Sequence, residues 1–194
     1  MNDTPNVRAS AHDLDLVALS AAGDRKAFGE LVRRHGSAVR GLLRRMGADH
    51  SLADDIAQDA FLAAFEQIAE FRGEGAFQGW VKRIAARLYV KRWRRDSRVD
   101  IMAEPPEQDA DLVSDAAGAA DRIDLDEALR TLSPVERLCV SLCYGGGLSH
   151  SEAALALNTP LGTIKSHVKR GLDKLRVRMA PGRVDENRES AAHG

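Results

Sequence analysis

The sequence is poor in the residues on which many folds and catalytic sites depend. Aromatic residues make up only 5% of the 194 residues, there are two cysteines, and long runs of Val, Ile and Thr are absent. Scarce β-branched and aromatic residues disfavour sheet, whereas abundant Ala, Leu and Arg favour helix. Two cysteines are too few for a disulfide scaffold, and a chain of this length does not need one. The composition therefore predicts an all-α protein.

Long hydrophobic runs are also missing. No apolar stretch approaches the roughly 20 residues that cross a bilayer. The first residues, MNDTPNVRASAHD, lack the apolar segment of a signal peptide. We therefore expect a cytoplasmic protein.

The residues that build metal sites and catalytic sites are not grouped. Cys139 and Cys143 lie four positions apart and the nearest histidine is His150, whereas a zinc site needs about four ligands. Two small buried thiols are the expectation, with a redox pair as the alternative. No set of His, Cys, Ser and acidic residues has a catalytic spacing, and no glycine-rich phosphate loop follows a strand. We expect no metal, no cofactor and no small-molecule substrate, which argues against an enzyme.

Charge is balanced over the chain but not along it. The formal net charge is −1, yet basic residues crowd into Trp80–Arg98 and again into PLGTIKSHVKRGLDKLR near the C-terminus. Between them, VDIMAEPPEQDADLVSDAAGAAD has no Lys or Arg and no sustained helical period, which is typical of a linker. The predicted organisation is two small helical domains, residues 11–96 and 121–179, joined by a flexible acidic linker at 97–120 and followed by a disordered tail at 180–194.

Helix-start signals recur in both halves. In the first half, Asp13 and Ser51 stand where they can cap helices that begin just after them. In the second half, SPVE and SHSE have the spacing of capping boxes, and the first of them places Pro134 at the first helical position. A short helix, HSEAALAL, is followed by a tight NTP turn and the basic helix. This succession is a helix-turn-helix pattern.

The basic helix has a polar face and an apolar face. In a helix-turn-helix the second helix enters the major groove of DNA. Lys165, Ser166, Lys169 and Arg170 share one face, whereas Ile164 and the later apolar residues fall opposite. The alternative is an amphipathic helix whose lysines are only solvated, but the short helix and turn before it favour DNA contact.

The upstream basic segment suggests a second contact with nucleic acid. Trp93 lies among Lys91, Arg92, Arg94 and Arg95, a combination suited to phosphate attraction and to stacking on an unpaired base. The alternative is a solvated helix end with its tryptophans in the core. Two separated basic elements indicate two contacts on one nucleic acid, as a promoter-binding factor requires.

Four stretches together resemble a known family. AGDRKAFGELVRRH, LADDIAQDAFLAAF, FRGEGAFQGWVKRIA and LSHSEAALALNTPLGTIKSHVKRGLDKLR are similar, in this order and spacing, to bacterial sigma-70-type factors. The likeness is to the short extracytoplasmic-function (ECF) group, which retains only regions 2 and 4. It covers nearly the whole chain apart from its two ends.

The resemblance implies a subunit of RNA polymerase that directs promoter-specific initiation. It implies that region 2 docks on the clamp helices of the core enzyme, that region 4 reaches its flap, and that the linker runs near the RNA exit path. The implied polymerase-binding residues are Asp54, Asp55, Gln58 and Asp59. The implied −10 element contacts are Phe71, Arg72, Gly73, Phe77, Arg83, Arg87, Lys91, Arg94 and Arg95. The resemblance further implies that the segment from Phe71 to Phe77 captures a base flipped from the non-template strand. The implied −35 element contacts are Lys165, Ser166, His167, Lys169 and Arg170.

The chain departs from the family pattern at three positions. Arg87 and Lys91 stand where the family often has Asn and an acidic or amide residue, and His167 stands where Arg is common. The first two add positive charge to the −10 surface and put its sequence preference in question.

The family also implies a partner, an anti-sigma factor that restrains the protein and that, if it lies in the membrane, holds the chain there. The competing hypothesis is a stand-alone helix-turn-helix regulator that binds DNA without polymerase. That reading leaves the glycine loop and the upstream basic helix without a role.

Overall fold

The structure is a computed structural model that describes residues 11–73, 75–96 and 125–179. All regular elements in these ranges are helical, as the composition predicts. In chain order they are α2 (Asp13–Ala21), α3 (Arg25–Met46), α4 (His50–Glu66), the 3-10 helix η1 (Ile68–Glu70), α5 (Phe77–Asp96), α6 (Leu125–Arg130), α7 (Pro134–Val140), the π-helix η2 (Ser141–Gly145), α8 (His150–Leu157) and α9 (Leu161–Met179). The predicted linker (97–120) and tail (180–194) lie outside the described residues. Along the described part of the chain, no helix is long and apolar enough to cross a membrane.

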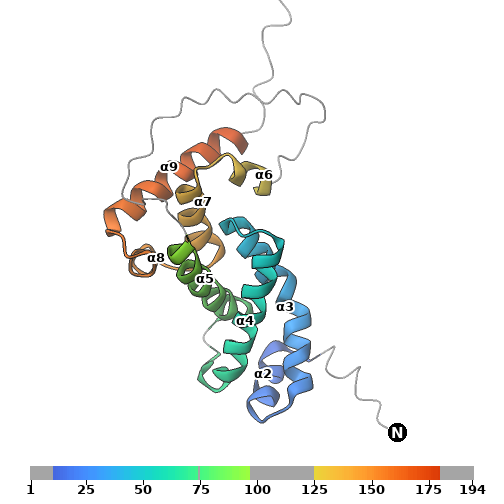
Figure 1. The fold of residues 1–194 in the computed structure, drawn as a ribbon. Coiled ribbons are helices and arrows are strands. Elements are labelled where there is room, and N and C mark those ends of the chain that lie inside the picture. The colour runs from blue at the N-terminus through green and yellow to red at the C-terminus, as the bar shows by residue number, and fades with distance from the viewer. Residues whose placement is uncertain (1–10, 74, 97–124, 180–194) are drawn as a thin grey trace, which may run out of the picture.

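The first domain packs α2, α4 and α5 around the long helix α3 (Figure 1). The carboxylate of Asp24 caps α3 by accepting hydrogen bonds from the amides of Lys26 and Ala27. The helix ends at Gly47, whose φ of 115° is the left-handed conformation that glycine adopts most readily. Leu31, Val39 and Leu43 of α3 are fully buried at the centre of this domain.

Two predicted caps in this domain are wrong. Asp49, not Ser51, caps α4, because its carboxylate accepts the amide of Leu52 at 2.8 Å. Asp13 is the first residue of α2 rather than its cap. Its carboxylate instead binds the side chains of Arg34 and His35 on α3, at 2.9 and 2.7 Å. A short acidic or hydroxyl residue indicates where a helix begins to within one or two residues. Which of several such residues caps the helix depends on the other partners available to each side chain.

The second domain contains the predicted helix-turn-helix. Both capping boxes are confirmed: Ser133 and Glu136 begin α7, and Ser149 and Glu152 begin α8. Asn158 ends α8 with a φ of 51°, in the left-handed region, and so reverses the chain into α9. Helices α8 and α9 are thus placed by local sequence signals.

A buried ion pair and a close helix contact fix α9 on α7. The side chain of Glu136 has no solvent exposure, and Lys174 of α9 reaches its carboxylate at 2.9 Å. At Gly171 of α9, an added Cβ would lie 2.7 Å from a methyl carbon of Val140. The two helices therefore approach so closely that only glycine fits at this point.

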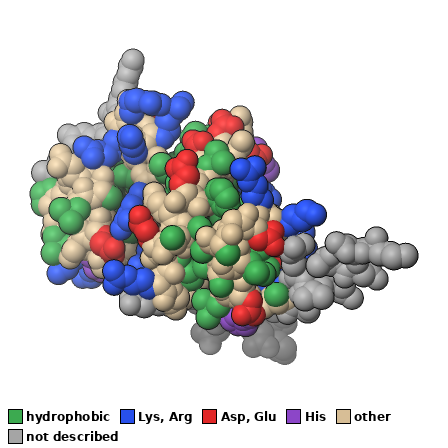
Figure 2. All heavy atoms as spheres, turned by 90° about the horizontal axis from the view of Figure 1, so that it is seen from below, with side chains coloured by type: hydrophobic (Ala, Val, Ile, Leu, Met, Phe, Trp, Pro, Cys, Tyr) green, Lys and Arg blue, Asp and Glu red, His purple; other side chains and the backbone are tan. Residues whose placement is uncertain are grey.

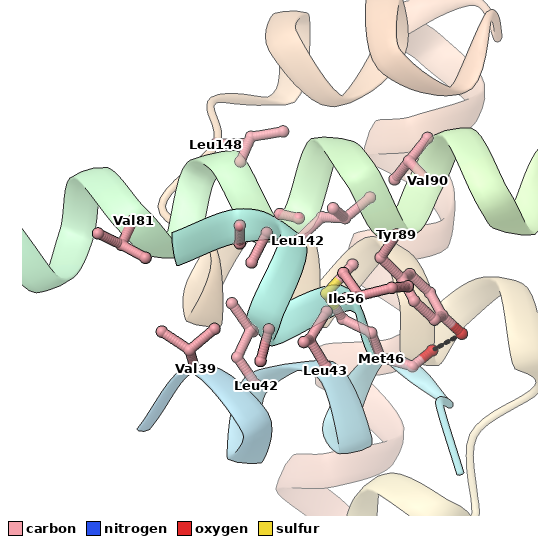
Figure 3. Packing of buried hydrophobic residues seen from close by; sticks show 14 of the residues in the cluster. Val39, Leu42, Leu43, Met46, Ile56, Val81, Tyr89, Val90, Leu142 and Leu148 are labelled. Atoms are coloured by element: carbon pink, nitrogen blue, oxygen red, sulfur yellow. Dashed lines mark hydrogen bonds between the residues drawn. The ribbon is translucent and has the colours of Figure 1, made fainter. Parts of the chain in front are cut away.

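The two domains are packed against each other and share one apolar core. Leu142 and Leu148 of the second domain are buried beside Leu42 of α3 and the apolar side of α5 (Figure 3). Beneath them, the hydroxyl of Tyr89 donates to the carbonyl of Met46 at 3.2 Å and joins α5 to the end of α3. The sequence predicted two domains but gave no indication of this packing.

Candidate functional site

Helix α9 presents a basic surface to solvent. Lys165, Ser166 and Lys169 are exposed, whereas Ile164 and Val168 are buried against the rest of the domain. The hydroxyl of Ser166 donates to the carbonyl of Gly162 at 3.0 Å within the helix. Lys and Arg side chains are more frequent on the left of Figure 2, the side on which α8 and α9 lie in Figure 1. The exposed residues fit the major-groove surface of a recognition helix.

His167 does not belong to this surface. Its side chain is only 2% exposed, which corrects the expectation that it contacts DNA. It follows Ile164 by one turn and precedes Val168, so it falls on the inward side of the helix. The guanidinium of Arg170, which is half-buried, lies 3.4 Å from Nδ1 of His167. Arg170 therefore lies at the edge of the basic surface, next to the buried side of the helix.

Helix α5 carries a second basic surface. The predicted −10 contacts on this helix, Arg83, Arg87, Lys91, Arg94 and Arg95, are all exposed. The last four line a hollow of about 560 Å³ that lies between α5 and α8 and also includes Leu155, Ala156 and Glu152 of α8. The second domain therefore borders the surface that is expected to meet the −10 element.

Three arginines of α5 contact the second domain directly. Arg83 donates to the carbonyl of Gly147 at 3.2 Å, and Arg94 donates to the carbonyl of Ala156 at 3.3 Å. Arg87 lies 3.6 Å from the carboxylate of Glu152. The Ser149 amide and hydroxyl lower the pKa of Glu152, and the charges of Arg83 and Arg87 lower it further.

Trp93, the aromatic side chain considered for base stacking, is half-buried and packs against the apolar core. This placement fits the alternative of a core tryptophan at the end of the helix. The basic residues around it remain exposed.

The glycine loop before α5 is held by aromatic packing. Phe77 is 1% exposed, which places it in the core rather than on a DNA surface. The ring of Phe71 meets it edge-on, with centroids 5.8 Å apart, and lies 5.3 Å from the ring of Trp80. Arg72 and Gly73 are exposed, and Gly73 has a positive φ of 74°. Of the predicted contacts in this loop, Arg72 and Gly73 are therefore exposed, whereas Phe77 is part of the core.

Helix α4 exposes an acidic face. Asp54, Asp55, Gln58 and Asp59 are all exposed, as the predicted polymerase-binding role requires. Beside this face lies an open groove of about 680 Å³, lined by Phe28, Val32, Phe61, Leu62 and Phe65 together with Asp54, Gln58 and two arginines.

This groove was not predicted from the sequence. Leu62 is 56% exposed and directly follows the buried Phe61, so it lies off the inward stripe of the helix. The sequence does contain one indication of such a groove, a large apolar residue next to the inward-facing apolar residues of α4.

Cys139 is buried and Cys143 is half-buried. Cys139 and Cys143 are both free thiols. Burial raises the pKa of Cys139 to about 12 and that of Cys143 to about 11, so both are protonated at neutral pH. Within the described ranges, no three His, Cys, Asp or Glu residues come together in a way that would hold a metal ion.

Comparison with known proteins identifies both domains. Residues 31–99 match the family described as Sigma-70 region 2, and residues 122–175 match the family described as Sigma-70, region 4. The chain is 33% identical to the RNA polymerase sigma factor NccH of Alcaligenes xylosoxydans xylosoxydans, over 89% of this chain and 97% of that protein. It is 32% identical to the ECF RNA polymerase sigma factor SigE of Mycolicibacterium smegmatis, over 92% of this chain and 72% of that protein.

Among solved structures, the chain is similar to the sigma factor RpoE of Bartonella quintana in its complex with the anti-sigma factor NepR. The sequences are 25% identical, the match covers 78% of this chain and 96% of that one, and the TM-score is 0.47. Regions 2 and 4 both match, in the order in which they occur in the family. The two curated relatives align over 97% and 72% of their own length. The chain therefore belongs to the sigma-70 family as an extracytoplasmic-function sigma factor, a transcription initiation factor that directs core RNA polymerase to promoters.

Proposed function

We propose that this sigma factor divides its work among three surfaces: α9 contacts the −35 element, α5 and the loop before it contact the −10 element, and α4 binds core polymerase. The observation that carries the proposal is the separation of charge, with exposed cations on α9 and α5 and exposed acids on α4. DNA phosphates attract the first two surfaces, whereas the third is suited to a basic protein partner.

The −35 contact is assigned to Lys165, Ser166 and Lys169, with Arg170 at the edge. Their exposure on the second helix of a helix-turn-helix supports the assignment. His167 serves as a core residue that positions this helix, because its side chain is buried.

The −10 contact is assigned to Arg83, Arg87, Lys91, Arg94 and Arg95, together with Arg72 and Gly73 of the loop. Unstacking a base costs a few kcal/mol, so the loop must recognise the extruded base to offset that cost. The packed aromatic cluster of Phe71, Phe77 and Trp80 supports this part of the loop.

The polymerase contact combines the acidic face of α4 with the adjacent apolar groove. Asp54 and Gln58 line the groove as well as the acidic face, which makes the two one continuous surface. A helical coiled-coil partner of basic character, such as the clamp helices, fits it, because an apolar groove accepts a helix face and the acids complement its charge. Region 4 would reach the flap of the core enzyme.

On family grounds, the partner that restrains the protein is an anti-sigma factor, and the response is to a stress or envelope signal. The chain would act in the cytoplasm, or at the membrane where such a partner holds it.

The test separates the surfaces by substitution. Asp54→Ala with Asp55→Ala should weaken co-elution with core polymerase and leave binding to a −35 duplex unchanged. Lys165→Ala with Lys169→Ala should do the reverse and reduce the salt dependence of duplex binding. If both pairs weaken both interactions equally, the division of surfaces is wrong.

A further inference from the structure

Helix α2 is fixed to α3 by polar contacts at its first residue. The carboxylate of Asp13 accepts hydrogen bonds from Nε2 of His35 at 2.7 Å and from the guanidinium of Arg34 at 2.9 Å. The same guanidinium donates to the carbonyl of Ala11 at 2.8 Å, so the start of α2 is held at two adjacent points. None of these residues belongs to the three surfaces proposed above.

His35 connects this contact to the aromatic cluster beneath the loop before α5. Its ring is tilted against that of Phe77, with centroids 5.6 Å apart. Phe77 in turn packs on the rings of Phe71 and Trp80. The side chain of His35 is only 13% exposed, and Phe77 is in the core. Because the bond with Asp13 fixes the orientation of the imidazole, it also fixes the surface on which Phe77 packs.

Helix α2 also touches the loop directly. The position that a Cβ of Gly73 would occupy lies 3.6 Å from Cδ2 of Leu14, so this leucine lies against the exposed part of the loop. Helix α2 packs on η1 as well, the element that leads into the loop. Helix α2 therefore acts on the loop through Leu14 and, by way of His35, through Phe77.

We propose that α2 and His35 are positioning elements for −10 recognition: the Asp13–His35 contact and Leu14 hold the loop in the conformation in which Arg72 and Gly73 meet the extruded base. The inference rests on the proposed role of this loop. Recognition groups must be held to within a fraction of an ångström by packing and by hydrogen bonds behind them. Asp13 and His35 act through the loop and touch no DNA, so their loss should reduce discrimination between bases.

The test measures base preference with the holoenzyme. Core RNA polymerase with the full-length chain transcribes a library built on a promoter that wild type uses, with its −10 element randomised, and sequencing of the RNA gives the yield for each base. His35→Phe keeps a ring beside Phe77 but cannot bind Asp13, and Asp13→Ala removes the same bond from the other end. Each should lower the preference at the captured position about 10-fold, since a displacement of about 1 Å can cost up to about 100-fold. Preferences in a second library, randomised in the −35 element, should stay unchanged.

The matched control is Asp15→Ala, which removes an exposed acid from the same helix and should keep the preference of wild type. The double variant Asp13→Ala with His35→Phe should resemble Asp13→Ala alone, because both changes break one contact. Each preference is a ratio measured with one protein, so a smaller folded fraction does not alter it. Wild-type preference in both single variants, or effects that multiply in the double variant, would overturn the inference.

A further variant separates this inference from the function on which it rests. Arg72→Ala changes the loop itself. If Arg72→Ala alters the preference and His35→Phe does not, the loop recognises the base and only the positioning role is wrong. If neither alters it, the assignment of the loop to the −10 element is wrong, and the inference is overturned with it.

Discussion

Glu136 is a carboxylate without solvent exposure that serves two purposes. Its backbone and side chain complete the capping box with Ser133, and Lys174 neutralises its charge from α9. Lys174 belongs to the basic stretch that favours DNA binding, yet its ammonium is held by this pair. A basic residue in a recognition helix can thus be structural, and the printed sequence alone does not distinguish the two roles.

Removing that partner should destabilise the second domain. Lys174→Met leaves a buried carboxylate without its cation, and we expect a loss of about 1–3 kcal/mol in the free energy of unfolding. Chemical denaturation measures it. Lys165→Met is the matched control, which should keep the stability of wild type but lose affinity for a −35 duplex. Equal stability of the two variants would show that the pair contributes nothing.

Gly171 should tolerate no side chain. In Gly171→Ala the new methyl group meets Val140 at 2.7 Å and forces α9 away from α7. Overpacking of this kind costs typically about 1–3 kcal/mol, which outweighs the helix propensity gained. Gly162→Ala, in the same helix with open space around it, should be neutral or stabilising. Thermal unfolding of both proteins tests this, and a stabilised Gly171→Ala would contradict the close approach.

At the scale of elements, α2 is tied to α3 by a small ionic network. Arg34 bridges Glu30 and Asp13, and Arg33 also binds Glu30. Hydrogen bonds from Arg33 and Arg34 lower the pKa of Glu30 to about 2. Burial raises the pKa of Asp13, but its contacts with Arg34 and His35 outweigh that effect and leave the pKa below its usual value.

This network should make the first domain sensitive to acid. Both carboxylates have a lower pKa in the folded than in the unfolded chain, so their stabilisation is present above pH 4.5 and is lost as pH falls toward about 2. The thermal midpoint should fall across that range, and Glu30→Gln should make the fall shallower. The control Glu66→Gln, outside the network, should keep the slope of wild type. A slope that Glu30→Gln leaves unchanged would rule the network out as its cause.

Element-scale signals were the most predictable part of the fold. Both capping boxes, the proline at the start of α7 and the turn before α9 were confirmed, because each depends on residues a few positions apart. Asp13 and His167 were misassigned for a different reason. Asp13 binds Arg34 and His35, which are distant in the sequence. His167 lies on the side of α9 that faces the core, whereas its polarity alone favours an exposed position.

At the scale of the whole molecule, the sequence predicted two domains and a promoter-binding function, and the comparisons confirmed the family. The domain boundaries and the assignment of site residues stay predictions. The packing of the two domains against each other was not predictable, because it is made by arginines of the kind that a DNA surface also uses and by a glycine with no side chain.

The most direct test of the account is transcription by the purified chain with core RNA polymerase on fragmented genomic DNA, followed by sequencing of the 5′ ends. New transcripts that share two upstream elements are expected, and both Lys165→Ala with Lys169→Ala and Asp54→Ala with Asp55→Ala should reduce them. Absence of such transcripts, together with tight duplex binding by the chain alone, would contradict the account and favour a regulator that works without polymerase.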